Sequence, residues 1–417
     1  MIAHKVVGSQ QLERLAVEQV RALWGRLAAV ESGEAAEQLA LEWSRALGRR
    51  VLEAGLQARL EAVEAEADRG CTCGARLGVH SRQARTVLTL LGAVRLRRRY
   101  LRCGRCGAHR FAADEWLGWE RGFSRLVQEA VAWQAAAMPY RQALAGLRKL
   151  AGVELSLGAA QKIVACWGAE ELRPQPYAER VKGRLAVQVD GTTAHLEDGW
   201  REVKVAALMQ WRRGKPGKVT YVADWLPAEQ FAEPLWREGL ARGAPCARQI
   251  AVIADGAPWI WELARFLFPR STQILDWYHA CEHLWAAAQT VHGEESPETL
   301  ALVERWKNEL WHGYSEGLED ELRELAGCAH DPDQVLRRVA DYLTTHQARL
   351  RYPLFRAAGW PLASGVVEGG CKHVIDLRFK RKSTRWKKPG ARAVLRLRLD
   401  ILNDRWENRR DHLRQAA

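Results

Sequence analysis

Two apolar runs each end in an aspartate followed by a glycine. The runs are LAVQVD, which ends at Asp190 before Gly191, and IAVIAD, which ends at Asp255 before Gly256. A buried strand delivers its last side chain to the rim of its sheet, and a glycine there lets backbone or ligand approach closely. Two carboxylates side by side require a cation, and their hard oxygen ligands suit Mg²⁺ or Mn²⁺. Either pair taken alone is more typical of a turn.

A third candidate carboxylate, Glu368, lies in the segment SGVVEGGCKHVIDLRF. Phosphoryl transfer by two metal ions about 3.5–4 Å apart needs such a further ligand. If the segment is a helix, Cys371, Lys372 and Ile375 share the face of this glutamate, and Lys372 reaches a phosphate beside the metals. Two alternatives stay open: Glu368 pairs with Lys372 on a solvated surface, or Asp376 is the ligand in its place.

Four of the nine cysteines form two short knuckles, at Cys71, Cys73, Cys103 and Cys106. Tetrahedral zinc takes four such ligands, and the residues between the knuckles alternate well enough for two strands that turn at Gly92. A hairpin this small gains stability from a bound metal. The first knuckle is one residue shorter than the usual spacing, so His80 or His109 is an alternative ligand. Reduced structural cysteines or a degenerate knuckle are the alternatives to zinc.

Charge is unevenly distributed along the 417 residues, which carry 63 lysines and arginines, 50 acidic residues and a formal net charge of +13. Residues 371–417 hold 15 basic and 5 acidic side chains, residues 74–110 hold ten arginines and no acid, and residues 1–70 hold 9 basic and 11 acidic ones. Basic blocks of this kind favour a polyanionic partner, because each neutralised phosphate releases counterions. A basic surface kept only for solubility is the alternative.

The bulk composition indicates a soluble protein of several domains. Hydrophobic residues make up 47% and charged residues 27% of the chain, and no apolar run is long enough to span a membrane. The first residues lack the pattern of a signal peptide, so we expect a cytoplasmic, nucleoid-associated protein without disulfides and without membrane contact. No Walker-type phosphate loop is present, and nothing indicates ATP chemistry.

Helices are expected on both sides of the cysteine region. Residues 9–68 have the periodicity of two or three amphipathic helices, and residues 120–170 that of three short ones, with Gly152 ending the second and Ser156 capping the third. The three short helices resemble a helix-turn-helix unit, in which the third would read DNA. Its exposed readers would be Gln161 and Lys162, which are equally well explained as ordinary surface residues.

The remaining segments predict a sheet and a long helical insertion. Residues 184–280 predict three successive strands and a helix, followed by alternating strands and helices. This order is typical of a mixed α/β sheet of ribonuclease-H type. Residues 280–358 have helical periodicity only and far exceed a normal connection, which indicates a functional element. Its tryptophans would stack on unpaired bases or pack inside the helices: Trp285, Trp306, Trp311 and, just after it, Trp360.

Four motifs occur in this order along the chain: Asp190-Gly, Asp255-Gly-Ala-x-Trp-Ile, Asp276-x2-His279 with Glu282-x-Leu-Trp285, and SGVVEGGCK followed by R-x-K-x4-RW. Together they resemble the motifs of a DDE transposase of a bacterial insertion sequence, of the ISKra-type family. The Asp-x2-His element is similar to one in Mutator-like and related transposases. The resemblance covers roughly residues 70–400.

The resemblance implies a catalytic trio of Asp190, Asp255 and Glu368 that holds Mg²⁺ or Mn²⁺. It also implies that His279 contacts the scissile phosphate or orients Asp255, although a structural donor is the commoner role for such a histidine. The expected activity is cleavage of double-stranded DNA at the transposon ends and joining of the 3′-hydroxyl to target DNA, by a homodimer or larger assembly. A DNA-binding regulator without activity and a structure-selective nuclease are the alternatives.

The predicted architecture is multidomain α+β, with a ribonuclease-H-like α/β catalytic domain and a large helical insertion. The predicted parts are an N-terminal helical region (1–69), zinc-ribbon-like knuckles (70–112), a helix-turn-helix-like domain (113–172), the catalytic domain (173–279 and 360–400), the insertion (280–359) and a basic tail (401–417). The predicted DNA contacts are Arg97, Arg98, Arg99, Gln161, Lys162, Lys372, Arg378, Lys380, Arg381, Lys382 and Arg385.

Overall fold

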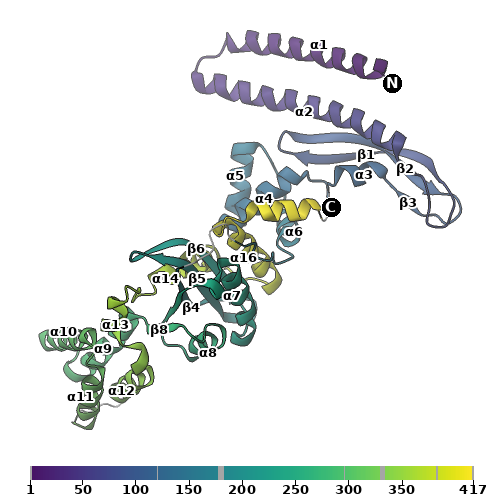
Figure 1. Ribbon diagram of the computed structural model, residues 1–417. Coiled ribbons are helices and arrows are strands. Elements are labelled where there is room, and N and C mark those ends of the chain that lie inside the picture. The colour runs from purple at the N-terminus through teal and green to yellow at the C-terminus, as the bar shows by residue number, and fades with distance from the viewer. Residues whose placement is uncertain are drawn as a thin grey trace. The chain divides into compact units, whose positions relative to one another are not determined.

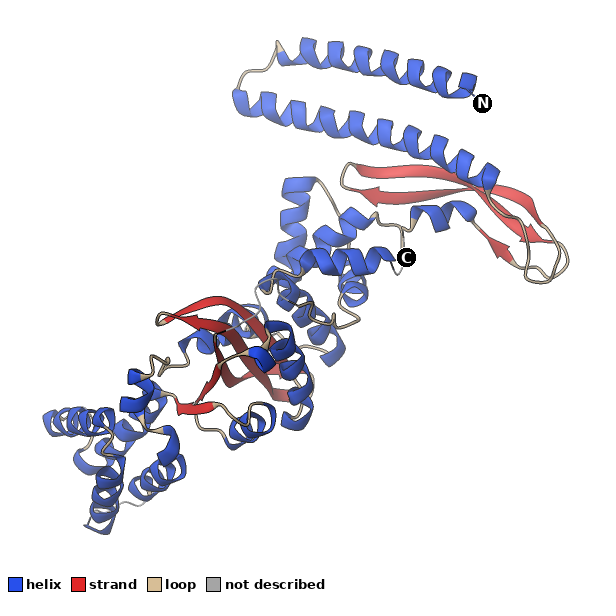
Figure 2. Cartoon of the chain, in the orientation of Figure 1, coloured by secondary structure: helices blue, strands red, loops and turns tan. Residues whose placement is uncertain are grey.

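The protein is described by a computed structural model over residues 2–119, 121–176, 183–294, 296–328, 334–381 and 384–415. It divides into two compact units, one made of Met1–Val164 with His412–Ala417 and the other of Ala165–Asp411. Helices and two sheets make up the described chain (Figures 1 and 2). The mixed α+β class expected from the sequence is therefore confirmed, while the finer domain boundaries stay predictions.

The first unit contains two long helices, a three-stranded sheet and shorter helices. Their bounds are α1 (Ile2–Leu27), α2 (Gly33–Glu66), β1 (Leu77–Thr89), β2 (Gly92–Cys103), β3 (His109–Arg110), α3 (Ala112–Leu117), α4 (Arg125–Ala137), α5 (Tyr140–Ala151) and α6 (Leu157–Trp167), whose end lies in the second unit. The predicted hairpin turns at Gly92, where φ is +108°, a value that favours glycine. Gly152 ends α5 with φ of +64°, and the Ser156 hydroxyl accepts the Ala159 N–H as a cap for α6.

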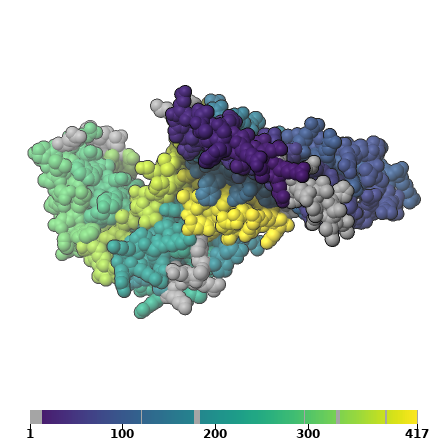
Figure 3. Space-filling model, turned by 90° about the horizontal axis from the view of Figure 1, so that it is seen from above, coloured from purple at the N-terminus to yellow at the C-terminus, as the bar shows by residue number. Residues whose placement is uncertain are grey.

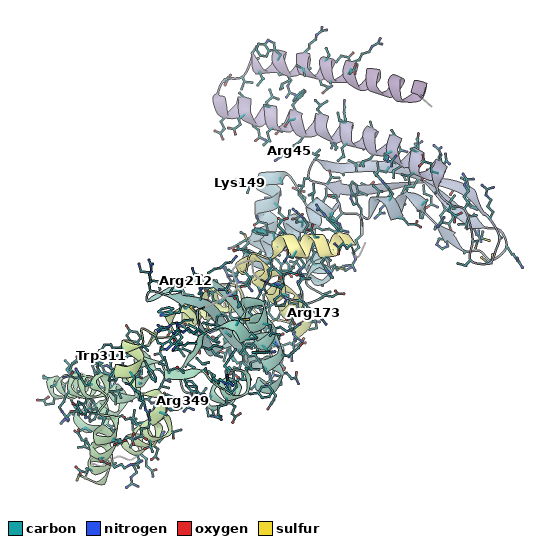
Figure 4. All side chains as sticks on the ribbon, in the orientation of Figure 1. Arg45, Lys149, Arg173, Arg212, Trp311 and Arg349 are labelled. Carbon is teal, nitrogen blue, oxygen red and sulfur yellow. The ribbon has the colours of Figure 1, made fainter. Side chains whose placement is uncertain are left out.

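Helix α2 covers the hairpin. Its Leu60 is fully buried among apolar side chains of both strands, and its Arg45 donates to the Leu150 carbonyl at the end of α5 (Figure 4). Backbone N–H groups of β2 donate to polar side chains of α2: Arg95 to Glu53, Arg97 to Gln57 and Arg99 to Glu64. Because an open strand edge pairs readily with another chain, these contacts close an edge that would otherwise be exposed.

The second unit is built on a five-stranded sheet with the order β6-β5-β4-β7-β8. Its strands are β4 (Arg184–Leu196), β5 (Gly199–Arg212), β6 (Lys215–Asp224), β7 (Gln249–Ala254) and β8 (Thr272–Leu275). Strand β5 runs antiparallel to β4 and β6, whereas β7 is parallel to both β4 and β8. Helix α7 (Ala228–Arg242), the short turn η1 (Ala244–Cys246) and helix α8 (Pro258–Leu267) lie between these strands in sequence.

Helices cover both faces of this sheet. Because side chains alternate along a strand, successive residues within β4 or within β5 point to opposite faces of the sheet. On one side Gln188 of β4 bonds the backbone of helix α14 (Gly365–Gly370). On the other side the Lys204 ammonium of β5 lies 4.8 Å from the ring centre of Trp259 in α8. The carboxylate of Asp190 shares the α14 side with Gln188.

The chain between β8 and α14 is helical, as the sequence predicts. It consists of α9 (Trp277–His292), α10 (Pro297–His312), α11 (Ser315–Cys328), α12 (Val335–His346), η2 (Gln347–Arg349) and α13 (Tyr352–Ala357). Helices α9 to α12 gather in one green lobe in Figure 3. None of the described helices is both long and apolar enough to cross a lipid bilayer.

Two of the four tryptophans proposed as stacking platforms are core residues. Trp306 is fully buried and Trp360 is 6% exposed, so neither offers a face to a base. The Trp311 ring (labelled in Figure 4) lies between the guanidinium of Arg356, at 3.9 Å, and the ring of Trp277, at 4.9 Å. Packing accounts for these three, and the stacking hypothesis is wrong for Trp306 and Trp360.

Helix α14 continues through a π-helical turn, η3 (Cys371–Asp376), into α15 (Leu377–Phe379), and α16 (Lys388–Leu402) and α17 (Trp406–Gln415) follow. The wider turn changes the expected face, because Cys371 and Ile375 are buried while Lys372 is exposed. The buried Arg398 guanidinium of α16 donates to the His373 and Val374 carbonyls, which the π turn leaves available. The run is helical, as predicted, but its register differs.

The two glycines after Glu368 have different surroundings. A Cβ on Gly369 would meet no atom within 4 Å, whereas a Cβ on Gly370 would lie 2.7 Å from the Tyr221 ring of β6. Gly369 therefore leaves open space next to Glu368. Gly370 instead lets the helix lie directly on the sheet.

We expect Gly370→Ala to lower the free energy of unfolding by about 1–3 kcal/mol, because the ring and the helix must separate. Gly369→Ala is the matched control and is expected to be neutral or stabilising, since alanine favours helix. Denaturant titration of both variants measures the difference. Equal stabilities would show that the close approach at Gly370 has no energetic weight.

Candidate active site and candidate metal centre

Three aspartates follow the last residues at which three neighbouring strands pair in parallel. Strand β4 pairs with β7 up to Val189 opposite Ala254, and β7 pairs with β8 up to Ala254 opposite Leu275. The next residues are Asp190, Asp255 and Asp276. Because parallel strands present the same ends together, the register brings all three to one rim of the sheet. The adjacency expected for Asp190 and Asp255 is present.

The backbone at Asp190 differs from the expected turn. Strand β4 does not end there but continues to Leu196, paired all along with β5. Only the parallel neighbour β7 ends at this level. Asp190 is therefore the first residue of β4 that no longer pairs with β7, although β4 itself continues. Asp255-Gly256 does form the turn, with Gly256 at φ of +104°. The prediction of two equivalent strand endings is therefore wrong for Asp190.

The Asp190 carboxylate is half-buried and surrounded by neutral donors. It accepts the Cys371 thiol at 3.3 Å and the Gly191 N–H at 2.6 Å. Burial raises its pKa, and the negative charges of Asp255 and Glu368 raise it further, against the lowering effect of the two hydrogen bonds. Asp255 and Glu368 thus lie near enough to Asp190 to repel it. The Cys371 thiol is held neutral because burial and Asp190 raise its pKa.

Glu368 is exposed on α14 and accepts the Ser364 hydroxyl at 2.7 Å. The Ser364 N–H in turn donates to the buried Asp276 carboxylate. Gln188 holds the same segment from the sheet, donating to the Ala363 carbonyl at 2.9 Å and accepting the Val367 N–H at 3.0 Å. Sheet and helix are therefore joined directly beneath Glu368.

Gln188, Asp276 and Ser364 were not recognised as supports for Glu368 from the sequence. A polar residue in the middle of the apolar run LAVQVD is one available signal, because a buried amide must find partners. Ser364 is four residues before Glu368, the spacing at which helical side chains meet. The predicted surface pairing of Glu368 with Lys372 is absent from the ion pairs of the described residues. Asp376, the rival carboxylate, pairs with Lys380 at 3.0 Å.

The carboxylate oxygens of Asp190, Asp255 and Glu368 do not form one tight cluster. Within the described ranges, the four cysteines are the only group of three or more Cys, His, Asp or Glu ligand atoms that all lie within 4.8 Å of one another. Asp190, Asp255 and Glu368 accept hydrogen bonds only from neutral groups, and no ion pair among the described residues includes them. Their negative charge is therefore not offset by a side-chain cation.

The four predicted cysteines form a candidate metal centre in the first unit. The Sγ atoms of Cys71 and Cys106 are 3.4 Å apart, those of Cys71 and Cys73 3.5 Å, and those of Cys73 and Cys103 3.7 Å. Backbone N–H groups of Cys106 and Arg105 lower the pKa of Cys103 to about 6, which favours the thiolate that a metal requires. The short first knuckle therefore still brings both of its thiols to the cluster.

The two histidines considered as substitutes are not needed for this ligand set. His80 and His109 both pack against the Tyr100 ring, with ring centres 5.7 and 5.4 Å away. The four-cysteine cluster could hold a metal ion by itself.

His279 lies in the first turn of α9, close behind the rim. Its backbone N–H donates to the Asp276 carboxylate at 2.8 Å, and its ring Nδ1 is 3.3 Å from the Glu282 carboxylate. The side chain is 38% exposed, so a ligand can reach it. Its catalytic role stays a prediction.

Most of the predicted DNA contacts are accessible. Exposed or partly exposed side chains are those of Arg97, Arg99, Gln161, Lys162, Lys372, Lys380, Arg381 and Arg385. Of these, Arg99 pairs with Glu64 at 3.4 Å, and Lys380 bonds the Thr192 hydroxyl at 2.6 Å beside Asp190. Lys382 lies outside the described residues.

Arg98 and Arg378 are corrections to this set. Arg98 is 8% exposed, pairs with Asp114 and lies over the Phe111 ring at 4.1 Å. Arg378 is 3% exposed, with its guanidinium 4.7 Å from the ring centre of Trp386. Both guanidinium groups are used in packing, and neither is available to a phosphate.

The sequence profile described as "Uncharacterised protein family (UPF0236)" matches residues 34–409, which include the four cysteines and all three carboxylates. The chain belongs to the UPF0236 family. It is similar to UPF0236 protein TTE0402 of Caldanaerobacter subterraneus subsp. tengcongensis, with 20% identity over 339 residues. The match covers 77% of this UPF0236 chain and 65% of that relative, so it spans somewhat less than two thirds of the relative's length.

We expect this UPF0236 protein to bind one metal ion per chain at the four cysteines. Cys103→Ser should remove the ion and lower the melting temperature, because metal binding contributes to the folding free energy. Metal content by mass spectrometry and thermal melting with and without a chelator measure both effects. Cys246→Ser, at an exposed cysteine in the other unit, is the control. Retention of the ion by Cys103→Ser would contradict the assignment.

We also expect Asp190→Asn to stabilise the metal-free protein at neutral pH. The pKa of Asp190 is raised on folding above its ordinary value of 3.8, so its ionised form opposes folding once the pH exceeds that value. The gain should therefore be largest near pH 7 and shrink as the pH falls toward 4. Denaturant titration across this range checks it, with the exposed Asp320→Asn as control. A gain that does not change with pH would contradict the raised pKa of Asp190.

Proposed function

We propose that this UPF0236 protein is a DNA transposase that cleaves at the ends of an insertion sequence and joins the freed 3′-hydroxyl to target DNA. One observation carries the proposal. Asp190, Asp255 and Glu368 gather at one rim of the sheet, where burial raises the pKa of Asp190 and the negative charges of the other two raise it further. Three acids that form no ion pair among the described residues are the expected state of a site that takes its cation from solution.

The sheet supports the same proposal. An order of β6-β5-β4-β7-β8, with antiparallel strands first and parallel strands last, agrees with a ribonuclease-H-like catalytic domain. In such α/β sheets, ligands bind beyond the carboxyl ends of the parallel strands. Asp190 and Asp255 lie at that end of β4 and β7, and the helical insertion follows β8.

The donor set fits a hard divalent cation. Carboxylate oxygens at Asp190, Asp255 and Glu368 are the ligands that Mg²⁺ or Mn²⁺ prefers, and their mutual repulsion would be relieved by binding one. When bound, the ions would activate the attacking oxygen and stabilise the leaving one. The neutral Cys371 thiol orients the Asp190 carboxylate, and Ser364 orients Glu368, before any ion arrives.

The two reaction steps balance without a nucleotide cofactor. Water attacks the phosphodiester at the element's end, one P–O bond forms as another breaks, and a 3′-hydroxyl is released. That hydroxyl then attacks a target phosphodiester, which releases a target 3′-hydroxyl in exchange. The developing charge on phosphorus is stabilised by electrostatics and positioning, so no protein-linked intermediate is needed.

Cations near the rim and in the first unit would bind the DNA backbone. Lys372, Lys380, Arg381 and Arg385 follow Glu368 in sequence and are exposed. In the first unit Arg121 and Lys162 line a hollow of about 630 Å³ at the start of α6. Zinc at the four cysteines would fix the hairpin that carries Arg97. Joining two DNA ends also requires two or more copies of the chain.

A DNA-binding regulator and a structure-selective nuclease share this fold and charge. A regulator needs no retained carboxylates at the rim, which makes it the weaker candidate. A nuclease would use the same carboxylates for cleavage alone. The products formed from DNA separate the three.

We expect the protein to join a pre-cleaved duplex with a free 3′-hydroxyl, taken from DNA flanking its gene, to a supercoiled plasmid in Mg²⁺ or Mn²⁺. Alanine at Asp190, Asp255 or Glu368 should reduce joining at least about a hundredfold, because each removes charge stabilisation of the transition state. Asp376→Ala is the matched control and should retain joining. Gel analysis of the plasmid gives the rates.

Three results would redirect the assignment. Cleavage without joining indicates the nuclease, and binding without either product indicates the regulator. Loss of joining in Asp376→Ala with retention in Glu368→Ala would exchange the roles of those two acids.

A further inference from the structure

Helix α12 of the insertion reaches back to the turn that carries Asp255. The Tyr342 hydroxyl donates to the Asp255 carbonyl oxygen at 2.9 Å, across 87 residues of sequence. Tyr342 belongs to the helical insertion, whereas Asp255 follows a central strand of the sheet. One hydrogen bond therefore connects the insertion to a rim carboxylate residue.

The turn leaves no space around this contact. Gly256 has φ of +104°, and a Cβ there would lie 2.7 Å from the Tyr342 hydroxyl oxygen and 3.2 Å from His346 Nε2. Glycine is thus required both by the backbone angle and by the two side chains of α12. The Tyr342 side chain therefore packs directly against the turn.

The Tyr342 ring also packs against two histidine rings. Its ring centre lies 4.0 Å from that of His283 in α9 and 4.7 Å from that of His346. His346 is buried, and its Nδ1 is 3.0 Å from the guanidinium of Arg349. Arg349 also donates to Gln273 of β8 at 2.9 Å, where the insertion meets the sheet (Figure 4).

The Asp255 carboxylate is bound to the same turn. Its Oδ1 accepts the Ala257 N–H at 3.0 Å, so the carboxylate direction follows the backbone of residues 255–257. A shift of the Asp255 carbonyl would change the side-chain direction with it. Contacts therefore run without a gap from α9 and α12, through Tyr342, to the carboxylate.

We infer that Tyr342 is a positioning residue for Asp255 and that the helical insertion braces the candidate active site through it. This inference rests on the proposed function, in which Asp255 binds a cation and the position of its carboxylate affects the reaction rate. A reacting group displaced by about 1 Å costs on the order of a hundredfold in rate. The Tyr342 hydroxyl donates to the Asp255 carbonyl oxygen and not to the carboxylate, so its effect on the reaction passes through the position of Asp255.

The test compares Tyr342→Phe with Tyr314→Phe. The first removes only the hydroxyl and keeps the ring against His283, and the second removes a hydroxyl from an insertion tyrosine that is 66% exposed. Amide hydrogen exchange at Ala257 reports whether the Asp255 carboxylate still holds its position. Joining of a pre-cleaved DNA end in Mn²⁺, with the DNA affinity measured separately, reports the effect on the reaction.

We expect Tyr342→Phe to speed exchange at Ala257 about tenfold and to slow joining about tenfold, with unchanged DNA affinity. Tyr314→Phe should change neither. Unchanged exchange at Ala257 would overturn the inference, and so would faster exchange with an unchanged joining rate. If the unaltered protein joins no DNA while Tyr342→Phe still speeds exchange, the positioning contact stands and the transposase proposal fails.

Discussion

The burial of Asp190 beside two further carboxylates, Asp255 and Glu368, at one rim of the mixed sheet is the constraint on which the candidate site depends. Burial disfavours the ionised carboxylate, and the two neighbouring negative charges add to that effect. The strand register brings Asp190, Asp255 and Asp276 to that rim, directly after the last parallel-paired residues of β4, β7 and β8. In the part of the chain that the structure describes, Asp190, Asp255 and Glu368 accept hydrogen bonds from neutral groups and take part in no ion pair.

The surroundings of these acids divide them into two roles. Asp276 is 2% exposed and accepts two backbone N–H groups, from His279 and Ser364, so it serves as a structural acceptor. Asp190 instead has a raised pKa from burial and from its anionic neighbours, Asp255 and Glu368. The same residue type at one rim of the sheet is thus a fully bonded structural acceptor after β8 and a carboxylate with a raised pKa in β4.

Local pattern predicted the elements well, and long-range contact explains where it failed. Strand periodicity placed β4 to β8, and glycine and serine predicted the helix ends at Gly152 and Ser156. The spacing of the four cysteines was enough to predict that they form one cluster. The sequence places Arg98 and Arg378 among the DNA contacts because a run of cations cannot show which of its members pack against an aromatic ring. Gln188 supports the helix of Glu368 by accepting the Val367 N–H, a bond between residues 179 apart that no local pattern reveals.

The helical insertion is closed at its base by the same buried aspartate. Asp276 caps α9 through the His279 N–H, where the insertion begins, and accepts the Ser364 N–H, where it ends. The Trp277 N–H adds a backbone bond to the Leu362 carbonyl at 2.9 Å. Because both ends are fixed at one point, the entropy of closing the intervening chain depends only weakly on its length. Helices can therefore be gained or lost beyond this point without moving Glu368, provided that α12 still reaches the Asp255 turn.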